Sequence, residues 1–344
     1  MADLVETLSK ELEAGISRER LYCRFDFLDR SFFNGLVDLL ESETVPDSET
    51  YEPPLAYGPF IEDGKKRISF AASPFVRFDI QTPSSYFDDV FRQQFAHLPY
   101  REGATYRKRV QVDLVRREND LWQLLFNGTE VGRAATEKSI PLILQENLII
   151  LAYQSAPYLM ALHAGAVTSE AGTVVMPAES GSGKTTLTAA LVQKGFSLYS
   201  DEIALLENDG KLTPLPFSLN IKEGSWEVLK GIGAEVEGPE FLRFDGQKVR
   251  YLPPLNLAEE RKSPDILLFP AYKKGAKTSV QELSPVEALR RITSAGYQLH
   301  SHLDAPLFEA LLEHLFRKPA YSITYDSLES AVGTVEELLV RKSS

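Results

Sequence analysis

Residues 172–202 read GTVVMPAESGSGKTTLTAALVQKGFSLYSDE and predict a strand, a loop, a helix and a second strand. The apolar run 173–176 has the β-rich composition of a strand, and helix-forming residues begin directly after Lys184. Gly195 is placed to end the helix, and residues 196–199 form a second short β-like run. Because a strand and a helix flank the loop, the stretch favours a phosphate-binding loop in an α/β fold over an ordinary glycine-serine loop.

The loop itself matches the phosphate-loop pattern, with Ala178 in place of the first glycine. Gly181 and Gly183 allow backbone conformations in which successive N–H groups converge on phosphate oxygens at a helix N-terminus. Lys184 is predicted to reach the β- and γ-phosphates, and the Thr185 hydroxyl to bind Mg²⁺. The predicted ATP-binding residues are Ala178, Glu179, Ser180, Gly181, Ser182, Gly183, Lys184, Thr185 and Thr186.

Two acidic residues, Asp201 and Glu202, follow the second predicted strand. Open α/β sheets place their ligands at the carboxyl ends of their strands. One carboxylate can hold Mg²⁺ while the other accepts a proton from an attacking hydroxyl. The alternative is an acidic turn that merely ends a strand.

The order and spacing of His163, the loop ending in Lys184, and the Asp201-Glu202 pair resemble the catalytic core of the HPr kinase/phosphorylase family. The resemblance covers residues 160–206, and the overall layout looks more like the shorter HPr kinase-related proteins found beside peptide-modification systems. It implies a P-loop kinase core with a mixed central sheet and flanking helices. The second signature associated with phosphorolysis is not found, so the resemblance favours kinase over phosphorylase activity.

The resemblance also implies roles for individual residues. Asp201 would act as general base on a substrate serine, and its neighbour Glu202, which stands where the family usually has a second Asp, would assist the metal. His163 would lie near the γ-phosphate, the alternative being a core histidine. Lys222 would lie near substrate or nucleotide, the alternative being a surface lysine. Four further cations are candidates for the transferred phosphate: Arg243, Arg250, Arg261 and Lys262.

Composition limits the class of protein. The chain has 344 residues, 43% of them hydrophobic, and can bury a large core. Its net charge of −12 argues against a nucleic-acid or anionic-membrane partner. The single cysteine, Cys23, excludes an internal disulfide, and Met1–Gly15 lacks the pattern of a signal peptide, so we expect a cytoplasmic protein. A zinc site at His300 and His302 is not favoured.

Residues 147–169 contain no Asp, Glu, Lys or Arg and are long enough to span a bilayer. Their polar residues, including His163, instead predict a buried helix followed by a buried strand.

We divide the chain near residue 137, into an N-terminal α+β region (1–137) and a catalytic domain (138–344). The first part is predicted to hold helices at 3–14 and 29–40, a loop at 41–65, and an antiparallel meander of strands at 109–117, 121–126 and 129–134. The second part is predicted to hold a helix at 141–153, a hairpin of 203–206 with 212–215, strands at 266–269 and 321–325, and helices at 285–295, 305–318 and 328–340.

The leading functional expectation is an ATP- and Mg²⁺-dependent kinase that phosphorylates a hydroxyl, most plainly a serine of a protein or peptide. A kinase for a small-metabolite hydroxyl is the first alternative, and a non-enzymatic, ATP-gated binding module is the second. The family resemblance allows a homo-oligomer.

Overall fold

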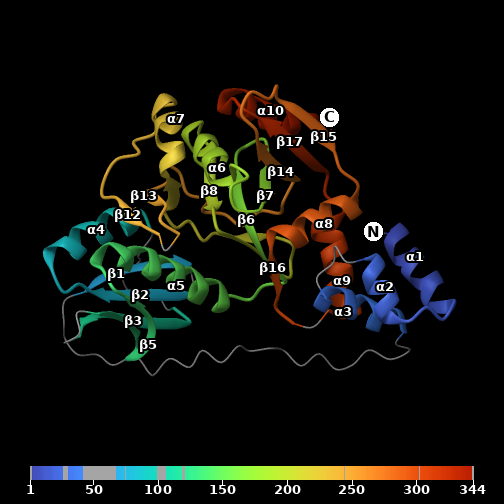
Figure 1. Ribbon diagram of the computed structural model, residues 1–344, viewed down its shortest axis with the longest axis horizontal. Helices are drawn as coiled ribbons and strands as arrows, with labels where there is room; N and C mark the ends of the chain where they lie inside the picture. Colours follow the sequence, from blue (N-terminus) through green and yellow to red (C-terminus); the bar gives the residue numbers. More distant parts are fainter. Residues whose placement is uncertain are drawn as a thin grey trace.

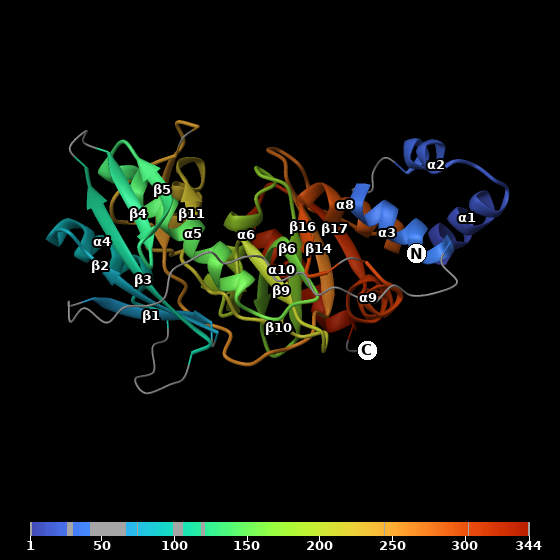
Figure 2. The ribbon, with the colours of Figure 1, turned by 90° about the horizontal axis from the view of Figure 1, so that it is seen from below.

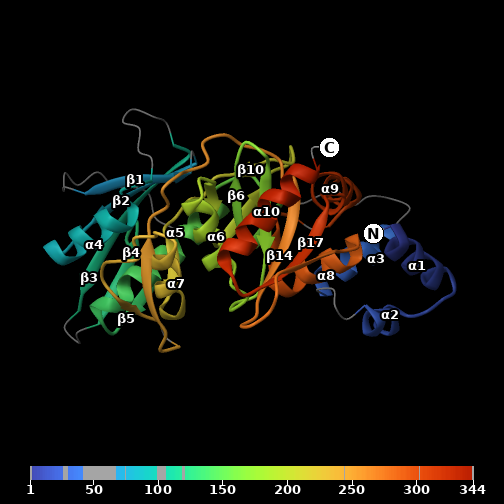
Figure 3. The same cartoon turned by 90° about the horizontal axis from the view of Figure 1, so that it is seen from above.

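The computed structural model describes residues 2–25, 30–41, 67–73, 75–98, 106–117, 121–243, 245–301 and 303–342. Figure 1 shows a central sheet with helices on both faces, a second sheet beside it, and a group of N-terminal helices on the other side. The views in Figures 2 and 3 agree that the second sheet and the N-terminal helices lie at opposite ends of the molecule.

The central sheet is mixed. Its described strands are β6 (Met160–Thr168), β7 (Thr173–Pro177), β8 (Ser197–Ser200), β9 (Ile203–Leu206), β10 (Leu212–Thr213), β14 (Ile266–Tyr272), β15 (Ser279–Glu282), β16 (Tyr297–Leu299) and β17 (Ala320–Tyr325). They follow the order β10-β9-β6-β7-β14-β17-β15, and β8 and β16 also pair with β6. The strands β7, β14 and β17 are mutually parallel, and the other pairs are antiparallel. The expected α/β class with a mixed central sheet is confirmed at this level.

Strand direction brings two distant loops to one edge of this sheet. Because β8 is antiparallel to β6, and β6 is antiparallel to β7, β8 runs in the same direction as β7. The carboxyl end of β7 leads into the phosphate loop, and that of β8 leads into Asp201. The two predicted halves of the site therefore meet at the same edge, where α/β sheets bind ligands.

Helices cover both faces of the central sheet. On one face lie α6 (Lys184–Gln193), α7 (Trp226–Gly231) and α10 (Leu328–Lys342). On the other lie α8 (Pro285–Ala295) and α9 (Ala305–Leu311), which continues into a π-helical turn, Leu312–Phe316. Within β14, Ile266 and Leu268 pack on the first group and Leu267 and Phe269 on the second. The strand reads as a continuous apolar run because both of its faces are buried.

The second sheet contains β1 (Ile68–Ser73), β2 (Val76–Gln81), β3 (Lys108–Arg116), β4 (Trp122–Phe126) and β5 (Thr129–Ala134), in that order. The predicted meander is confirmed for β3, β4 and β5, and Asn127 and Gly128 have the positive φ values, 46° and 80°, that a tight hairpin turn requires. The sequence did not predict β1, β2 or the helix α4 (Ser85–Phe95). The predicted helix α5 (Ile140–Gln154) packs in the same hydrophobic cluster as this sheet.

A small antiparallel sheet that the sequence analysis did not predict joins the two larger ones. It has the order β11-β13-β12, with β11 (Leu219–Lys222), β12 (Phe241–Leu242) and β13 (Lys248–Leu252). Phe241 and Val249 pack with the second sheet, whereas Leu219 and Ile221 pack with α6. This small sheet forms one wall of the candidate site.

The N-terminal helices are α1 (Ala2–Glu13), α2 (Arg18–Arg24) and α3 (Arg30–Glu41), of which α2 was not predicted. Phe32 and Phe33 of α3 are buried against the central domain, and a Cβ on Gly35 would come within 2.7 Å of Leu303. The loop predicted for 41–65 lies outside the described residues, apart from its first residue. The residues placed in one N-terminal region thus pack on two different parts of the molecule.

Two helix starts were predicted from their capping residues, and both are confirmed. The Ser284 hydroxyl accepts a hydrogen bond from the Glu287 amide, and Asp304 accepts one from the Leu307 amide. In the part of the chain that the structure describes, no helix is long and apolar enough to cross a membrane. The uncharged stretch 147–169 forms the end of α5 followed by β6, as predicted.

Candidate functional site

The predicted phosphate loop joins β7 to the first residue of α6. Gly181 and Gly183 have φ values of 88° and 89°, in the left-handed region that favours glycine. A Cβ on Gly183 would also come within 2.6 Å of the Tyr325 hydroxyl, whereas a Cβ on Gly181 would meet nothing within 4 Å. Both glycines are thus needed for backbone conformation, and Gly183 also for close packing.

Lys184 lies at the centre of the site and is only 6% exposed. Its Nζ donates to the backbone oxygen of Asp201 at 2.6 Å and lies 3.3 Å from Nε2 of His163. Strand β6 approaches this turn of α6 closely, since a Cβ on Gly165 would lie 2.5 Å from the Thr188 hydroxyl. The side chain of Lys184 therefore connects the phosphate loop to both β6 and the end of β8.

His163 is oriented by the backbone at the end of α8. Its Nδ1 lies 2.9 Å from the carbonyl oxygen of Ala295. A carbonyl can only accept, so Nδ1 carries the hydrogen and Nε2 of the neutral ring is left as an acceptor. Nε2 faces the Lys184 ammonium and lies 3.6 Å from Oε2 of Glu202. The ring is thus held between a cation and a carboxylate.

The side chain of Asp201 is buried beside Lys184, and the residue is 4% exposed. Neither carboxylate oxygen has a hydrogen-bond partner among the described residues. Burial raises the pKa of Asp201 to about 6, against the opposing effect of the Lys184 charge. A buried carboxylate with two unused oxygens is suited to a bound cation or to proton transfer.

Glu202 differs from its neighbour in exposure and in partners. Its side chain is 39% exposed and lines a cavity together with His163. Burial would raise its pKa, but the neighbouring His163 ring and the charge of Lys184 outweigh that effect, so the pKa of Glu202 is lowered. The pair therefore consists of one carboxylate that resists ionisation and one that favours it.

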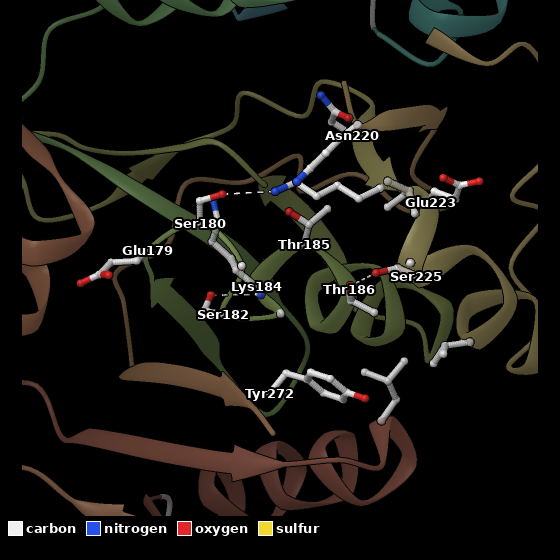
Figure 4. Close-up of a pocket in the computed structure, with 18 of the residues that line it drawn as sticks. Glu179, Ser180, Ser182, Lys184, Thr185, Thr186, Asn220, Glu223, Ser225 and Tyr272 are labelled. Atoms are coloured by element: carbon white, nitrogen blue, oxygen red, sulfur yellow. Dashed lines mark hydrogen bonds between the residues drawn. The ribbon is translucent and has the colours of Figure 1, made fainter. Parts of the chain in front are cut away.

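A cavity of about 770 Å³ contains most of these groups. Figure 4 shows the phosphate loop and the start of α6 across its middle, with Asn220 and Glu223 on one side and Tyr272 on the other. Lys222 donates to the Ser180 hydroxyl at 3.2 Å, and the hydroxyls of Thr186 and Ser225 are 2.7 Å apart. These two contacts tie the small sheet and α7 to the phosphate loop and the start of α6.

The structure brings most of the predicted site residues together. Those that line the cavity are His163, Glu202, Lys222 and all residues from Glu179 to Thr186. Ala178 and Asp201 are buried and do not line it.

Of the four candidate cations for the transferred phosphate, only Arg243 lines the cavity. Arg250 pairs with Glu240 and lies over the Trp226 ring, Arg261 pairs with Glu207 and Asp209, and Lys262 lines a separate hollow.

The structure describes only one of the two histidines considered for a zinc site. His300 packs edge-on against Tyr158, and His302 lies outside the described residues. The described residues contain no group of three or more His, Cys, Asp or Glu side chains placed to hold a metal ion.

Part of the cavity lining was not predicted from the sequence: Tyr272, Tyr325, Val228 and Leu328. The strand predicted at 266–269 was expected to end before Pro270, but β14 continues to Tyr272. The available signal was that each tyrosine ends a strand, β14 or β17, and that α/β sheets bind ligands at such strand ends.

Comparison with known proteins gives no match, neither to a model of a protein family nor to a curated protein.

Proposed function

We propose that this protein is an ATP- and Mg²⁺-dependent kinase of the HPr kinase type that transfers the γ-phosphoryl group to a hydroxyl. The observation that carries the proposal is the meeting of Lys184, His163 and Glu202 with the phosphate loop in one cavity. Phosphoryl transfer depends on positioning and on neutralising charge, and these groups offer both.

The loop amides and Lys184 would bind the phosphates of ATP. The residues present also fit Mg²⁺. Asp201 has two buried carboxylate oxygens, and the Thr185 hydroxyl lies close enough to lower the pKa of this carboxylate. Hydroxyl and carboxylate oxygens are ligands that Mg²⁺ prefers, alongside phosphate oxygens and water. Thr185 and one or both of the carboxylates of Asp201 and Glu202 would hold the ion, which neutralises phosphate charge when bound.

The proton of the acceptor hydroxyl needs a base. We assign this role to Asp201. Its raised pKa is closer to the pKa of a hydroxyl than that of an ordinary carboxylate, which makes it a stronger base. Glu202 is the second candidate, because it is the carboxylate that lines the cavity and pairs with His163. Binding and transfer measurements on variants of each residue distinguish the two assignments.

The proposed acceptor is a serine of a protein or peptide, which would enter the cavity with its side chain. The second candidate is a small metabolite, which a cavity of about 770 Å³ favours because its volume is typical of small-molecule sites. A nucleotide-gated binding module is the non-enzymatic candidate.

The test is ATP consumption by the purified protein with Mg²⁺, combined with a mass-spectrometric search of cell extract for new phosphorylated products. Lys184→Ala should abolish both signals, whereas Lys211→Ala, at an exposed position outside the cavity, should retain them. A phosphopeptide supports the serine acceptor, and a phosphorylated small molecule supports the second candidate. ATP binding without a product that depends on Lys184 would replace the kinase with the binding module.

A further inference from the structure

The cavity is lined by both charged and apolar side chains. Charged side chains, including those of Lys222, Arg243 and Glu202, line part of it. Another part of the lining comes from Tyr272, Tyr325, Val228 and Leu328, and Tyr272 and Val228 are each 50% exposed. These half-exposed apolar side chains share the cavity with the phosphate loop. Such a lining suits a ligand that carries an apolar group attached to phosphate.

The position of Tyr272 is set by the phosphate loop. Its backbone amide donates to the carbonyl oxygen of Ser182 at 2.8 Å, so β14 is hydrogen-bonded directly to the loop. Tyr325, its partner in the register with β17, donates from its hydroxyl to the carbonyl of Gly183 at 3.2 Å. The two rings meet edge to face, with centroids 6.0 Å apart. The aromatic surface is thereby held at a fixed place beside the loop.

The opposite side of this groove is held just as firmly. Thr186, in the first turn of α6, shares a hydrogen bond with Ser225, immediately before α7. Val228 lies three residues further on, which brings it to the same side of α7 as Ser225. Leu328 begins α10, and Figures 1 and 3 show α6 between α7 and α10. The start of α6 thus forms the floor between Val228 of α7 on one side and Leu328 of α10 on the other.

We propose that this groove, formed by Tyr272, Val228 and Leu328, is the nucleobase subsite, with the base lying on the Tyr272 ring. The assignment rests on the proposed function, since it requires a nucleoside triphosphate on the phosphate loop. The triphosphate would extend from Thr186 toward Lys184 and Glu202, which leaves the nucleoside on the side of α7 and α10. In Figure 4 the labelled Tyr272 lies on the side of the loop away from Asn220 and Glu223.

The Asp326 carboxylate supports the ring rather than reading the base. It accepts from the Gly275 amide at 2.8 Å, and its hydrogen bonding to the Tyr272 hydroxyl raises the pKa of Tyr272. Recognition in this groove therefore depends on stacking, which tolerates different bases because each has a π-face. We expect adenine and guanine nucleotides to depend on Tyr272 alike.

The experiment compares the binding of Mg²⁺-ATP, Mg²⁺-GTP and Mg²⁺-tripolyphosphate, which has no nucleoside, by calorimetry. Tyr272→Ala should weaken both nucleotides by about tenfold or more, a size typical of base–aromatic stacking, and leave tripolyphosphate binding unchanged. Tyr272→Phe keeps the ring and should retain most of the affinity. Tyr86→Ala removes a partly exposed tyrosine of α4, outside the cavity, and should change nothing.

The outcomes separate the two proposals. Equal weakening of nucleotides and tripolyphosphate by Tyr272→Ala would show a distorted loop and overturn the subsite. Nucleotide affinity unchanged by Tyr272→Ala would overturn it as well, while leaving the proposed kinase intact. A wild-type protein that binds none of the three ligands would overturn the proposed function and the subsite together.

Discussion

Asp201 and Glu202 are adjacent in the sequence but occupy different environments. Asp201 turns into the protein beside Lys184, and Glu202 turns into the cavity beside His163. Neighbours at the end of a strand point in different directions, so one can serve the buried side and the other the open side. Metal binding and proton transfer can therefore belong to different residues of this pair.

Conservative variants separate the two roles. With Asp201 as the base, Asp201→Asn should bind Mg²⁺-ATP with nearly wild-type affinity and lose phosphoryl transfer by about 100-fold or more. With Asp201 as the metal ligand, the same variant should lose the Mg²⁺ dependence of ATP binding. Titration of ATP binding with Mg²⁺, followed by single-turnover transfer, distinguishes the two. Glu202→Gln is the matched variant, and a loss of transfer in it alone would move the base to Glu202.

The pH profile gives an independent test of the base. A base must be deprotonated to act, and the pKa of Asp201 is raised to about 6 whereas that of Glu202 is lowered. With Asp201 as base, kcat/KM should fall by about tenfold per pH unit below pH 6, because this ratio reports groups of the free enzyme. A profile that stays level down to about pH 4.5 would contradict the assignment.

At the scale of elements, the phosphate loop is shaped by the strands around it. Gly181 and Gly183 have nearly the same φ, but only Gly183 is packed against other side chains. A Cβ on Gly183 would lie 2.6 Å from Oη of Tyr325 and 3.0 Å from Cβ of Tyr272. The loop is therefore tightly packed against β14 and β17 at Gly183, whereas Gly181 has open space around it.

This asymmetry predicts different effects of the same substitution. Gly181→Ala should cost about 1–2 kcal/mol of stability through its left-handed backbone alone. Gly183→Ala should cost more, because the Tyr325 ring or the loop must also move. Urea unfolding of the two variants measures the difference, and equal losses would show that the contacts with the tyrosines do not constrain the loop.

At the scale of the whole molecule, a histidine links the second sheet to the central domain. His97, just after α4, donates from Nε2 to the carbonyl oxygen of Pro216 at 2.8 Å, in the segment between β10 and β11. Burial lowers the pKa of His97 from 6.5 to about 4. The neutral ring is thus part of the contact between two distant parts of the chain.

The shift predicts a loss of stability in acid. Between pH 6.5 and 4 the unfolded chain binds a proton at His97 that the folded chain does not, so the free energy of unfolding falls as the pH is lowered through this window. The full effect is at most about 3 kcal/mol. Asp201, with its raised pKa, contributes in the opposite direction, so the comparison must be between wild type and His97→Gln. The difference between them should shrink toward pH 4, and a constant difference would contradict the role of His97.

The sequence by itself determined the local parts of the site. The strand 173–176, the loop that ends at Lys184 and the helix after it follow from composition and spacing, because these elements form from contiguous residues. The turn at Asn127-Gly128 and the capped start at Ser284 were predictable for the same reason. Each of these features depends on interactions within a few residues along the chain.

Only the tertiary structure decided which distant residues share the cavity. Arg243 lines it and Arg250 does not, although both come from the same small sheet region, and Tyr272 joins it because β14 pairs in parallel with β7 and β17. Likewise, the N-terminal helices and the second sheet were predicted as one region, yet they pack at opposite ends. Strand order and packing depend on burial between segments far apart in the sequence, and no pattern within a single segment encodes which partner will cover it.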